Sequence, residues 1–355
     1  MSAQLLIARS QVATSVLPGL VPPQCSEGAP YALRWDVGED ASLVFELVLP
    51  PALLKAAKQI IPCFSCLAPQ NYAYQFSLEF ETVQGGFGGA TWLSPIGRIE
   101  LAAKVCQLET PPVQSAIDVL VLEEGLAAAT LKLRVFPAGP EDLQVSPALV
   151  SVSISSSSAP CEKEKISPEA GVHIDIPVPS KSQMEQDPNL GPRICSPTSV
   201  SMVLDYYGRK TDPLEVASVA YHLRHDLYGI WPAALYAASR WGLLGYLLEF
   251  PSWDAVQWLL DRRIPVVASI CYQEGELQNA AIAATAGHLV VVRGYSADTV
   301  QVNDPAADSA AEVCRLYARR EFEKVWLERT AVGYVIFPPA GPSQSVDDKI
   351  LWAQT

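Results

Sequence analysis

The sequence predicts an α+β protein in two parts: a β-sandwich or jelly-roll-like domain over residues 1–155, and a second domain over residues 170–338. Three observations favour this division. Short strand-like runs separated by turn residues fill the first part, a polar and serine-rich linker covers residues 156–169, and beyond it the pattern becomes helix first and then strand. A chain of 355 residues is long enough to form two domains. Residues 339–355 are expected to form a C-terminal tail.

The strands expected in the first part are runs rich in Val, Ile, Leu, Phe and Tyr, several of which alternate apolar and polar residues. One helix is expected within this part, over Pro51–Ile61, and the cluster Gly85–Gly89 is typical of a turn. The expected strands are Ala32–Val37, Ser42–Leu49, Tyr72–Thr82, Arg98–Leu108, Ala116–Leu122 and Ala127–Phe136.

The role of this β-rich domain is open from the sequence. Packing against the second domain, or presenting a substrate to it, is the favoured interpretation. Carbohydrate or peptide binding is the alternative, because Trp35 and Trp92 could line a sugar site. Tryptophan in β-domains is more often part of the core.

Composition excludes some classes of function. The net charge of −13 argues against a nucleic-acid-binding surface and against anionic membranes as partners. No stretch approaches the roughly 20 apolar residues of a spanning helix, so membrane insertion is not expected. The first residues lack the pattern of a secretory signal, so a cytoplasmic location is expected. Nothing in the sequence indicates an oligomeric state.

The eight cysteines do not indicate a disulfide framework in a chain of this length without a signal. Cys63 and Cys66 form a CxxC, but no second pair follows at the spacing of a zinc ribbon. Ordinary thiols are therefore favoured over a metal site. His222 and His225 lie on an expected helix, Leu214–Leu227, and are interpreted as exposed or interface residues rather than zinc ligands.

The segment from Gly191 to Gly208 has the pattern of a helix with a cysteine at its start. Ser196 is a suitable N-cap, Pro197 fits the first helical position, and Gly208 is a suitable stop. Apolar residues at positions 200, 203, 204 and 207 predict one buried stripe. Cys195 would lie just ahead of the helix, where unpaired N–H groups favour the nucleophilic thiolate. A small apolar residue closing the helix start is the alternative interpretation.

Two strand patterns joined by a short turn predict a β-hairpin, Gly287–Tyr295 with Thr299–Pro305. Burial suggests its register, because one arrangement places four β-branched side chains on the same face. In that register the opposed pairs are Val290 with Val302 and Val292 with Val300.

The same register sets His288 opposite Asp304, with Cβ atoms roughly 4.5–5.5 Å apart. A carboxylate in that place could accept the Nδ1 proton, hold the ring and stabilise the imidazolium. A register shifted by one residue would put Asn303 there instead, and Asn is also competent to orient a catalytic histidine. A strand histidine satisfied by a neighbour is the structural alternative for His288.

Four blocks, Val178–Gln183, Cys195–Gly208, Gly287–Tyr295 and Val302–Pro305, occur in one order. Together they resemble the bacteriocin-processing-like (double-glycine leader peptidase-like) cysteine peptidase family of the papain-like superfamily. The resemblance covers roughly residues 170–338. It implies a papain-like fold with Cys195 as nucleophile, His288 as base and Asp304 as the orienting residue.

The resemblance also implies a role for Gln183, which matches the family's glutamine by its Pro-x-x-x-Gln context. Its side-chain amide would stabilise the oxyanion together with the backbone N–H of Cys195. Gln186 is the alternative. The family commonly has Gly directly after the cysteine, where this chain has Ser196. That difference changes the steric room beside the nucleophile.

The expected function is therefore a cysteine peptidase that cleaves a peptide or protein substrate through a thioester acyl-enzyme. No metal or organic cofactor is expected. Two alternatives stay open. An acyl or peptidyl transferase would use the same residues with another acceptor, and a catalytically silent peptide-binding module would use none of them for chemistry.

Overall fold

The computed structural model describes residues 2–10, 20–25, 30–38, 40–83, 85, 87–98, 110–138, 140–156 and 173–339. Within these ranges the chain is mixed α/β, with three β-sheets. The strand predicted over Arg98–Leu108 lies almost entirely outside the described residues, as do most of the predicted linker and tail. None of the helices in the described part has the length and hydrophobicity needed to cross a bilayer.

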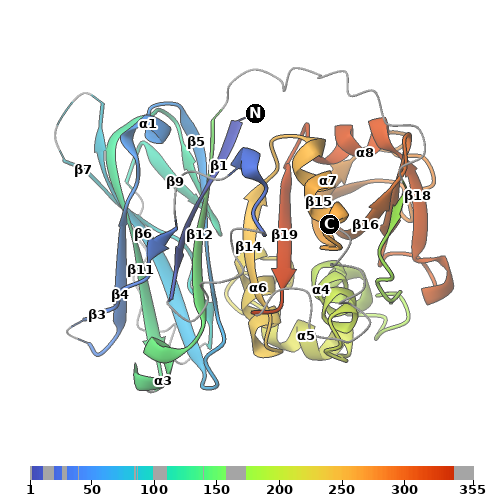
Figure 1. The fold of residues 1–355 in the computed structure, drawn as a ribbon, viewed down its shortest axis with the longest axis horizontal. Helices are drawn as coiled ribbons and strands as arrows, with labels where there is room; N and C mark the ends of the chain where they lie inside the picture. Colours follow the sequence, from blue (N-terminus) through green and yellow to red (C-terminus); the bar gives the residue numbers. More distant parts are fainter. Residues whose placement is uncertain are drawn as a thin grey trace.

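The N-terminal part contains two of the sheets, A and B (Figure 1). Sheet A has the strand order β2-β1-β12-β5-β10-β9, with β1 (Ser2–Arg9), β2 (Tyr31–Ala32), β5 (Ala57–Cys66), β9 (Val113–Ala116), β10 (Val119–Leu122) and β12 (Ala148–Ser156). Sheet B has the order β3-β4-β11-β6-β7, with β8 also on β6; its strands are β3 (Asp36–Val37), β4 (Leu43–Val48), β6 (Tyr72–Thr82), β7 (Phe87–Trp92), β8 (Ile96–Gly97) and β11 (Leu126–Pro137).

Alternation along the strands builds the core between these sheets. In β4, Leu43, Phe45 and Leu47 are buried while the residues between them are more exposed. They join one hydrophobic cluster with residues of sheet A such as Phe64 and Val152. The N-terminal part is β-rich, as predicted. Its short helical pieces are η3 (Pro23–Cys25), α1 (Pro51–Leu54) and α3 (Pro140–Val145).

The helix predicted over Pro51–Ile61 is wrong beyond its first turn. Helix α1 ends at Leu54, and strand β5 begins at Ala57. Strand β5 is central in sheet A, where β12 and β10 bond it on both sides. The ladder and the β-branched pair that begins at Ile60 favour a strand there over a second helical turn.

The C-terminal part contains sheet C, whose strand pairs are antiparallel. The order is β14-β19-β15-β16-β17-β18, with β13 also on β16. The strands are β13 (Ile174–Asp175), β14 (Leu244–Glu249), β15 (Val266–Tyr272), β16 (Thr285–Tyr295), β17 (Thr299–Asn303), β18 (Cys314–Ala318) and β19 (Val332–Phe337).

Helices pack against sheet C, and the first α-helix of this part carries Cys195. Helix α4 packs on β16, α6 on β14 and β19, and α7 and α8 on β15. Figure 1 shows α7 and α8 toward one end of the sheet and α4, α5 and α6 toward the other. The helices are η4 (Gly191–Arg193), α4 (Cys195–Tyr206), α5 (Pro213–Ala220), α6 (Trp231–Arg240), α7 (Trp253–Asp261), η5 (Ala310–Glu312) and α8 (Arg319–Trp326).

Sheet A packs directly on the C-terminal part through β14 and α6. Strand β12 alternates, so Val150, Val152 and Ile154 enter the cluster between sheets A and B, and a row of buried serines faces the other way. The small serine side chains allow β14 to approach closely. The backbone N–H of Glu249 on β14 donates to the hydroxyl of Ser153 (3.1 Å).

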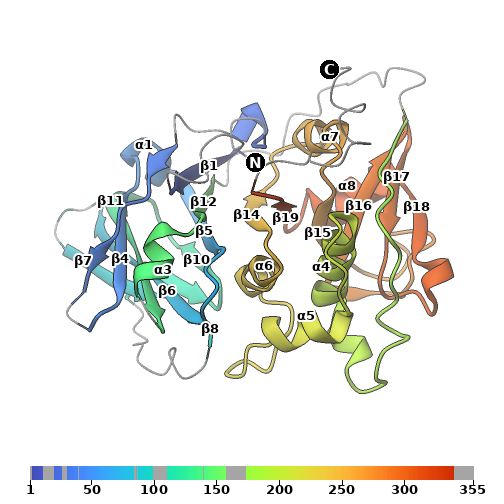
Figure 2. The ribbon, with the colours of Figure 1, turned by 60° about the horizontal axis from the view of Figure 1, so that its bottom comes forward.

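Helix α6 lies between the two parts (Figure 2). Ala233 and Tyr236 belong to the N-terminal cluster, whereas Leu235 belongs to the cluster that fills the C-terminal part. The carboxylate of Asp118 accepts the N–H of the first residue of the helix (2.9 Å). At the other end, Arg240 donates to the backbone carbonyls of Ala68 (2.9 Å), Pro69 (3.2 Å) and Gln70 (3.1 Å).

Candidate active site

Helix α4 places Cys195 at its N-terminus. Cys195 is the first residue of the helix, and the turn η4 leads into it through Ile194. Cys195 as a residue is partly exposed, and the residues that follow it, as far as Leu204, are buried. The sulfur accepts a hydrogen bond from the backbone of Ser196. Unpaired N–H groups and the helix dipole favour the anionic form of a thiol in this position.

The predicted cap of this helix is wrong. Ile194 holds the N-cap position without a side-chain hydrogen bond, so the helix begins one residue before Ser196. The hydroxyl of Ser196 lies 3.2 Å from the hydroxyl of Tyr334 on β19. The Ser196 side chain, which the local sequence predicts as the cap, is therefore engaged in a tertiary contact instead.

The other end of the helix follows the prediction. Gly208 has φ of +76°, and the N–H of Arg209 bonds the carbonyl of Leu204 (2.9 Å), which completes a Schellman termination. The prediction of one buried stripe is wrong, because every residue from Ser196 to Leu204 is buried. Helix α4 lies inside the C-terminal part rather than on its surface.

Strand β16 carries His288 beside this helix. The hydroxyl of Ser199 donates to the carbonyl of Leu289 (2.9 Å) and holds α4 against the strand one residue from His288. His288 is 3% exposed. Its ring is hydrogen-bonded to Cys195, and the backbone of Leu289 also bonds the sulfur.

Asp304 lies on the other side of the His288 ring. The distance from His288 Nε2 to Asp304 Oδ1 is 2.7 Å, and the N–H of Ala306 donates to the same oxygen (3.0 Å). The hydroxyl of Tyr317 donates to Oδ2 (2.7 Å). Asp304 is completely buried. Because Nε2 is engaged with the carboxylate, Nδ1 is the ring nitrogen left for Cys195, the reverse of the predicted arrangement.

The predicted register of the hairpin is also wrong. Val302 pairs with Val292, and a bulge then shifts the pairing so that Tyr295 lies opposite Val300. The bulge adjoins Gly294, where a Cβ would lie 2.2 Å from the carbonyl oxygen of Ile174 on β13. His288 therefore does not lie opposite Asp304 in the ladder. Asp304 follows the end of β17, and its carboxylate reaches back to the ring.

The charges at these groups favour a thiolate and an imidazolium. Burial lowers the pKa of His288, but the charges and hydrogen bonds of Asp304 and Cys195 together outweigh burial and raise it to about 10. Burial raises the pKa of the Cys195 thiol, but the hydrogen bond and charge of His288, with backbone hydrogen bonds at Leu289 and Ser196, outweigh burial and leave it lowered. Burial likewise opposes ionisation of Asp304, and His288 and Tyr317 bring the pKa of that carboxyl down to about 2.

Gln183 lies in the loop before the cysteine, packed against the segments that carry the other groups. Its backbone N–H donates to the carbonyl of Pro305 (2.8 Å), next to Asp304. A Cβ on Gly191, in the turn that leads to Cys195, would lie 2.7 Å from the Gln183 carbonyl oxygen. Gln183 is 3% exposed, whereas Gln186 is more exposed.

Comparison with known proteins identifies the C-terminal part. Residues 175–334 match the model of the Peptidase_C39 like family. These residues form a C39-like peptidase domain. The match confirms the resemblance to the bacteriocin-processing cysteine peptidases, and it makes this part of the chain a thiol-dependent peptidase.

Two solved structures are similar to the C39-like domain. One is described as a C39-like peptidase from Bacillus anthracis, with 20% identity, a TM-score of 0.37, and coverage of 46% of this chain and 97% of the other. The second is the peptidase domain of Streptococcus ComA, a bifunctional ABC transporter involved in a quorum sensing pathway, with 14% identity, a TM-score of 0.33, and coverage of 45% and 98%. The TM-scores are low, so the identification stands on the family match. No curated protein matches the chain.

Asn303, the alternative orienting residue, has a different position in the C39-like domain. Its side-chain amide donates to the carbonyls of Val178 (3.1 Å) and Pro179 (3.2 Å), and not to His288. Asn303 therefore holds the loop that leads to Gln183.

The histidine pair of the C39-like domain lies at the boundary with the N-terminal part. The expected helix over Leu214–Leu227 is wrong, because α5 ends at Ala220 and His222 pairs with Leu227 in an isolated bridge. His222 Nε2 lies 2.9 Å from the carbonyl oxygen of Pro95, and His225 Nε2 lies 2.8 Å from the hydroxyl of Ser94. Both are interface residues.

The CxxC of the N-terminal part is divided between two environments. Cys63 packs in the cluster shared with the C39-like domain, and Cys66 packs between sheets A and B. Burial raises the pKa of both thiols. Among the tryptophans, Trp35 packs edge-on against Phe64 at the border of the same core.

Sequence reasoning missed Tyr317 and the partners of Lys181. Tyr317 lies opposite Val300 in the ladder, so only the pairing of β17 with β18 brings its hydroxyl to Asp304. Lys181 forms an ion pair with Asp205 on α4 (3.1 Å). Neither pair has a spacing in the sequence that marks it.

Proposed function

We propose that the chain is a cysteine peptidase in which Cys195, His288 and Asp304 form a catalytic triad. The observation that carries this proposal is the continuous set of hydrogen bonds from Cys195 through His288 to the buried Asp304. The opposed pKa shifts of Cys195 and His288 favour a thiolate–imidazolium pair near neutral pH. Such a pair supplies a nucleophile and a proton donor together.

The proposed reaction begins with attack of the Cys195 thiolate on the carbonyl carbon of a peptide bond. The backbone N–H of Cys195 and the side-chain amide of Gln183 stabilise the tetrahedral oxyanion. His288 then gives its Nδ1 proton to the leaving amine as the C–N bond breaks, and a thioester remains on Cys195. Water hydrolyses the thioester with His288 as base, which regenerates the thiolate–imidazolium pair.

Asp304 acts through His288 in this scheme. Its carboxylate fixes the ring, so that Nδ1 faces the thiol, and it stabilises the imidazolium in the resting pair and again after His288 has taken a proton from water. The chemistry needs no metal or organic cofactor. The substrate is proposed to be a peptide or protein, and a cytoplasmic location and a lack of nucleic-acid partners stay predictions.

The β-rich part is proposed to be a sandwich or jelly-roll-like packing partner of the peptidase, with domain limits at 1–155 and 170–338 joined by the linker 156–169. The contacts along α6 support a packing role over a separate binding role. Asp118 bonds the start of that helix and Arg240 bonds the N-terminal part from its end.

The test is site-resolved alkylation with iodoacetamide, read by peptide mass spectrometry, together with cleavage of a peptide library. Cys195 is expected to react fast well below pH 8. Cys314 serves as the internal reference because it is exposed. Cleavage is expected to require Cys195 and to be lost in Cys195→Ala.

Reaction of Cys195 no faster than Cys314, with no cleavage, would overturn the proposal and favour a silent peptide-binding module. Cleavage that stops at a stable thioester until an amine is added would instead identify a transferase. Mass spectrometry of the product distinguishes these outcomes.

A further inference from the structure

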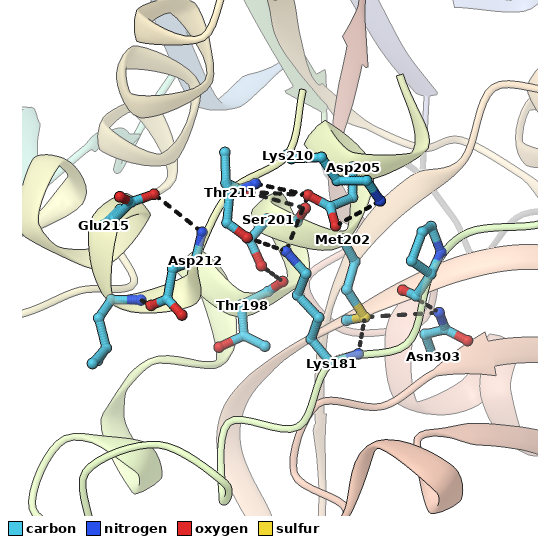
Figure 3. A network of polar contacts seen from close by, with 12 residues as sticks. Lys181, Thr198, Ser201, Met202, Asp205, Lys210, Thr211, Asp212, Glu215 and Asn303 are labelled. Carbon is cyan, nitrogen blue, oxygen red and sulfur yellow. Dashed lines mark hydrogen bonds and ion pairs between the residues drawn. The ribbon is translucent and has the colours of Figure 1, made fainter. Parts of the chain in front are cut away.

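The loop that carries Gln183 is held by the same helix that carries Cys195. Figure 3 shows this network: Lys181 reaches Asp205 and Thr211 beside the C-terminal half of α4, while Met202 of the helix lies between Lys181 and Asn303. The backbone N–H of Lys181 donates to the sulfur of Met202 (3.3 Å).

The Lys181–Asp205 ion pair is the charged centre of the network. Lys181 Nζ lies 3.1 Å from Asp205 Oδ1, with side chains only 16% and 8% exposed. Nζ also donates to the carbonyl of Thr211 (2.5 Å), and Asp205 Oδ1 accepts the N–H of Thr211 (2.9 Å). A charge pair this well buried is stable only while its partners remain in place. Lys210 also pairs with Asp205, at 3.4 Å to Oδ2, but it is 78% exposed.

Ser182 and Gln183, the two residues after Lys181, are hydrogen-bonded to the turn that follows Asp304. The hydroxyl of Ser182 donates to the carbonyl of Ala307 (2.5 Å), and the N–H of Gln183 donates to that of Pro305 (2.8 Å). The backbone that leads into Gln183 is therefore clamped between the helix of the nucleophile and the turn of the orienting carboxylate.

The side chain of Gln183 is not fixed by a bond at its own oxygen. Gln183 Oε1 is buried and has no hydrogen-bond partner among the described residues. No hydrogen bond at this oxygen among the described residues fixes the amide, so the backbone that carries the side chain contributes to its position. Lys181 fixes that backbone to α4 through Asp205. Asp205 lies ten residues along the helix from Cys195, a distance of about 15 Å along the helix axis.

We propose that Lys181 is a positioning residue of the oxyanion hole. Through its ion pair with Asp205 it fixes Gln183 relative to the Cys195 end of the same helix. The inference rests on the proposed function, in which Gln183 donates to the oxyanion. Lys181 does not touch the substrate. It sets the distance at which the Gln183 amide meets the developing charge.

The test is a double-mutant cycle on the full chain with a peptide substrate. Lys181→Met should lower kcat about tenfold and leave KM within about twofold, because a small displacement of a catalytic group is costly in the transition state. Gln183→Ala should lower kcat about 100-fold. The double variant should be no slower than Gln183→Ala alone, because Lys181 acts through that residue.

Two further measurements separate positioning from a general loss of structure. The rate of Cys195 alkylation by iodoacetamide needs no oxyanion hole, so it should be unchanged in Lys181→Met. Lys210→Met is the matched control, because it removes the exposed partner of the same carboxylate, and kcat should stay at the wild-type value. Lys181→Met combined with Asp205→Asn removes both charges and should reproduce the fall in kcat with a thermal midpoint near that of the wild type.

Additive effects of Lys181→Met and Gln183→Ala, or equal losses of kcat and of alkylation rate, would overturn this inference and leave the peptidase proposal intact. A wild-type protein without Cys195-dependent cleavage would overturn both.

Discussion

The hydroxyl of Tyr317 donates a 2.7 Å hydrogen bond to the oxygen of Asp304 that His288 leaves unused. Both carboxylate oxygens are thereby satisfied within a completely buried site. A buried carboxylate is tolerated only with such partners. Tyr317 therefore stabilises the imidazolium of His288 indirectly, through its hydrogen bond to Asp304.

Tyr317→Phe should destabilise the fold by about 1.5–3 kcal/mol at neutral pH, because a charged oxygen loses its donor. Urea unfolding measures the change. Tyr207→Phe is the matched control, since the Tyr207 hydroxyl is buried and has no hydrogen-bond partner among the described residues. That control should be neutral or stabilising. Equal behaviour of the two variants would contradict the role of Tyr317.

His288→Ala should reduce turnover by orders of magnitude and leave the fold largely intact. Without the imidazolium, the burial that raises the pKa of Cys195 is no longer opposed by its main partner. Fast alkylation of Cys195 should then move to higher pH. Near-normal turnover would remove His288 from the mechanism.

Asp304→Ala and Asn303→Ala should differ in kind. The first removes the partner that raises the pKa of His288, so it should cost more activity and shift the pH profile of Cys195 alkylation. The second releases the backbone at Val178 and Pro179, so it should lower kcat without moving that profile. A larger loss and a shifted profile in Asn303→Ala would show that Asn303 orients the ring.

The ion pair predicts how stability depends on pH. A raised His288 pKa contributes stability that is complete below 6.5 and lost as the pH rises through about 10. A lowered Cys195 pKa contributes stability that is present above 9.0 and lost as the pH falls through its folded value. At about pH 8 the folded and unfolded pairs each hold one proton. The opposite pH dependences of the two contributions then cancel, and the free energy of unfolding of the wild type should show a plateau.

Cys195→Ser removes the second contribution. Relative to the wild type, its free energy of unfolding should begin to fall above pH 6.5, by up to about 1.4 kcal/mol per pH unit. Denaturant midpoints at half-unit steps from pH 6 to pH 10 measure this difference. Parallel curves for the two proteins would show that no proton is transferred from Cys195 to His288.

Arg240→Met should destabilise the whole protein by about 1–3 kcal/mol, because three backbone carbonyls of the N-terminal part lose a charged donor. Thermal unfolding followed by tryptophan fluorescence measures it. Arg320→Met is the control: Arg320 is exposed on α8, and its replacement should stay within about 0.5 kcal/mol. An unchanged midpoint in Arg240→Met would mean that the contact contributes little.

The sequence predicts correctly those features that depend on neighbouring residues alone. Strand β6 was predicted with its bounds over Tyr72–Thr82, and Gly208 ends its helix in the left-handed conformation that glycine favours. The hairpin register failed for a physical reason. A shift of two residues keeps every valine on its face, so burial could not distinguish the two registers. The observed ladder also has a bulge beside Gly294, where β16 pairs with β13, more than 100 residues earlier in the chain, and no local pattern encodes that contact.

The types of residue in the sequence, and not a correct prediction of local geometry, indicated the candidate site. Cys195 and His288 are hydrogen-bonded, although the predicted N-cap of the helix and the predicted register of the hairpin are both wrong. Tyr317 and Lys181 act through contacts that exist only when the sheet and α4 are assembled, and no periodicity encodes such contacts.

Helix α6 carries residues of two hydrophobic cores on opposite sides. A fragment limited to residues 175–334 would turn Ile230, Ala233 and Tyr236 from interior residues into surface residues. Water would then meet an apolar face that only sheets A and B can cover. The range that matches the family therefore leaves out the sheets that cover this face of α6, and a fragment of residues 175–334 is expected to expose an apolar surface that favours aggregation.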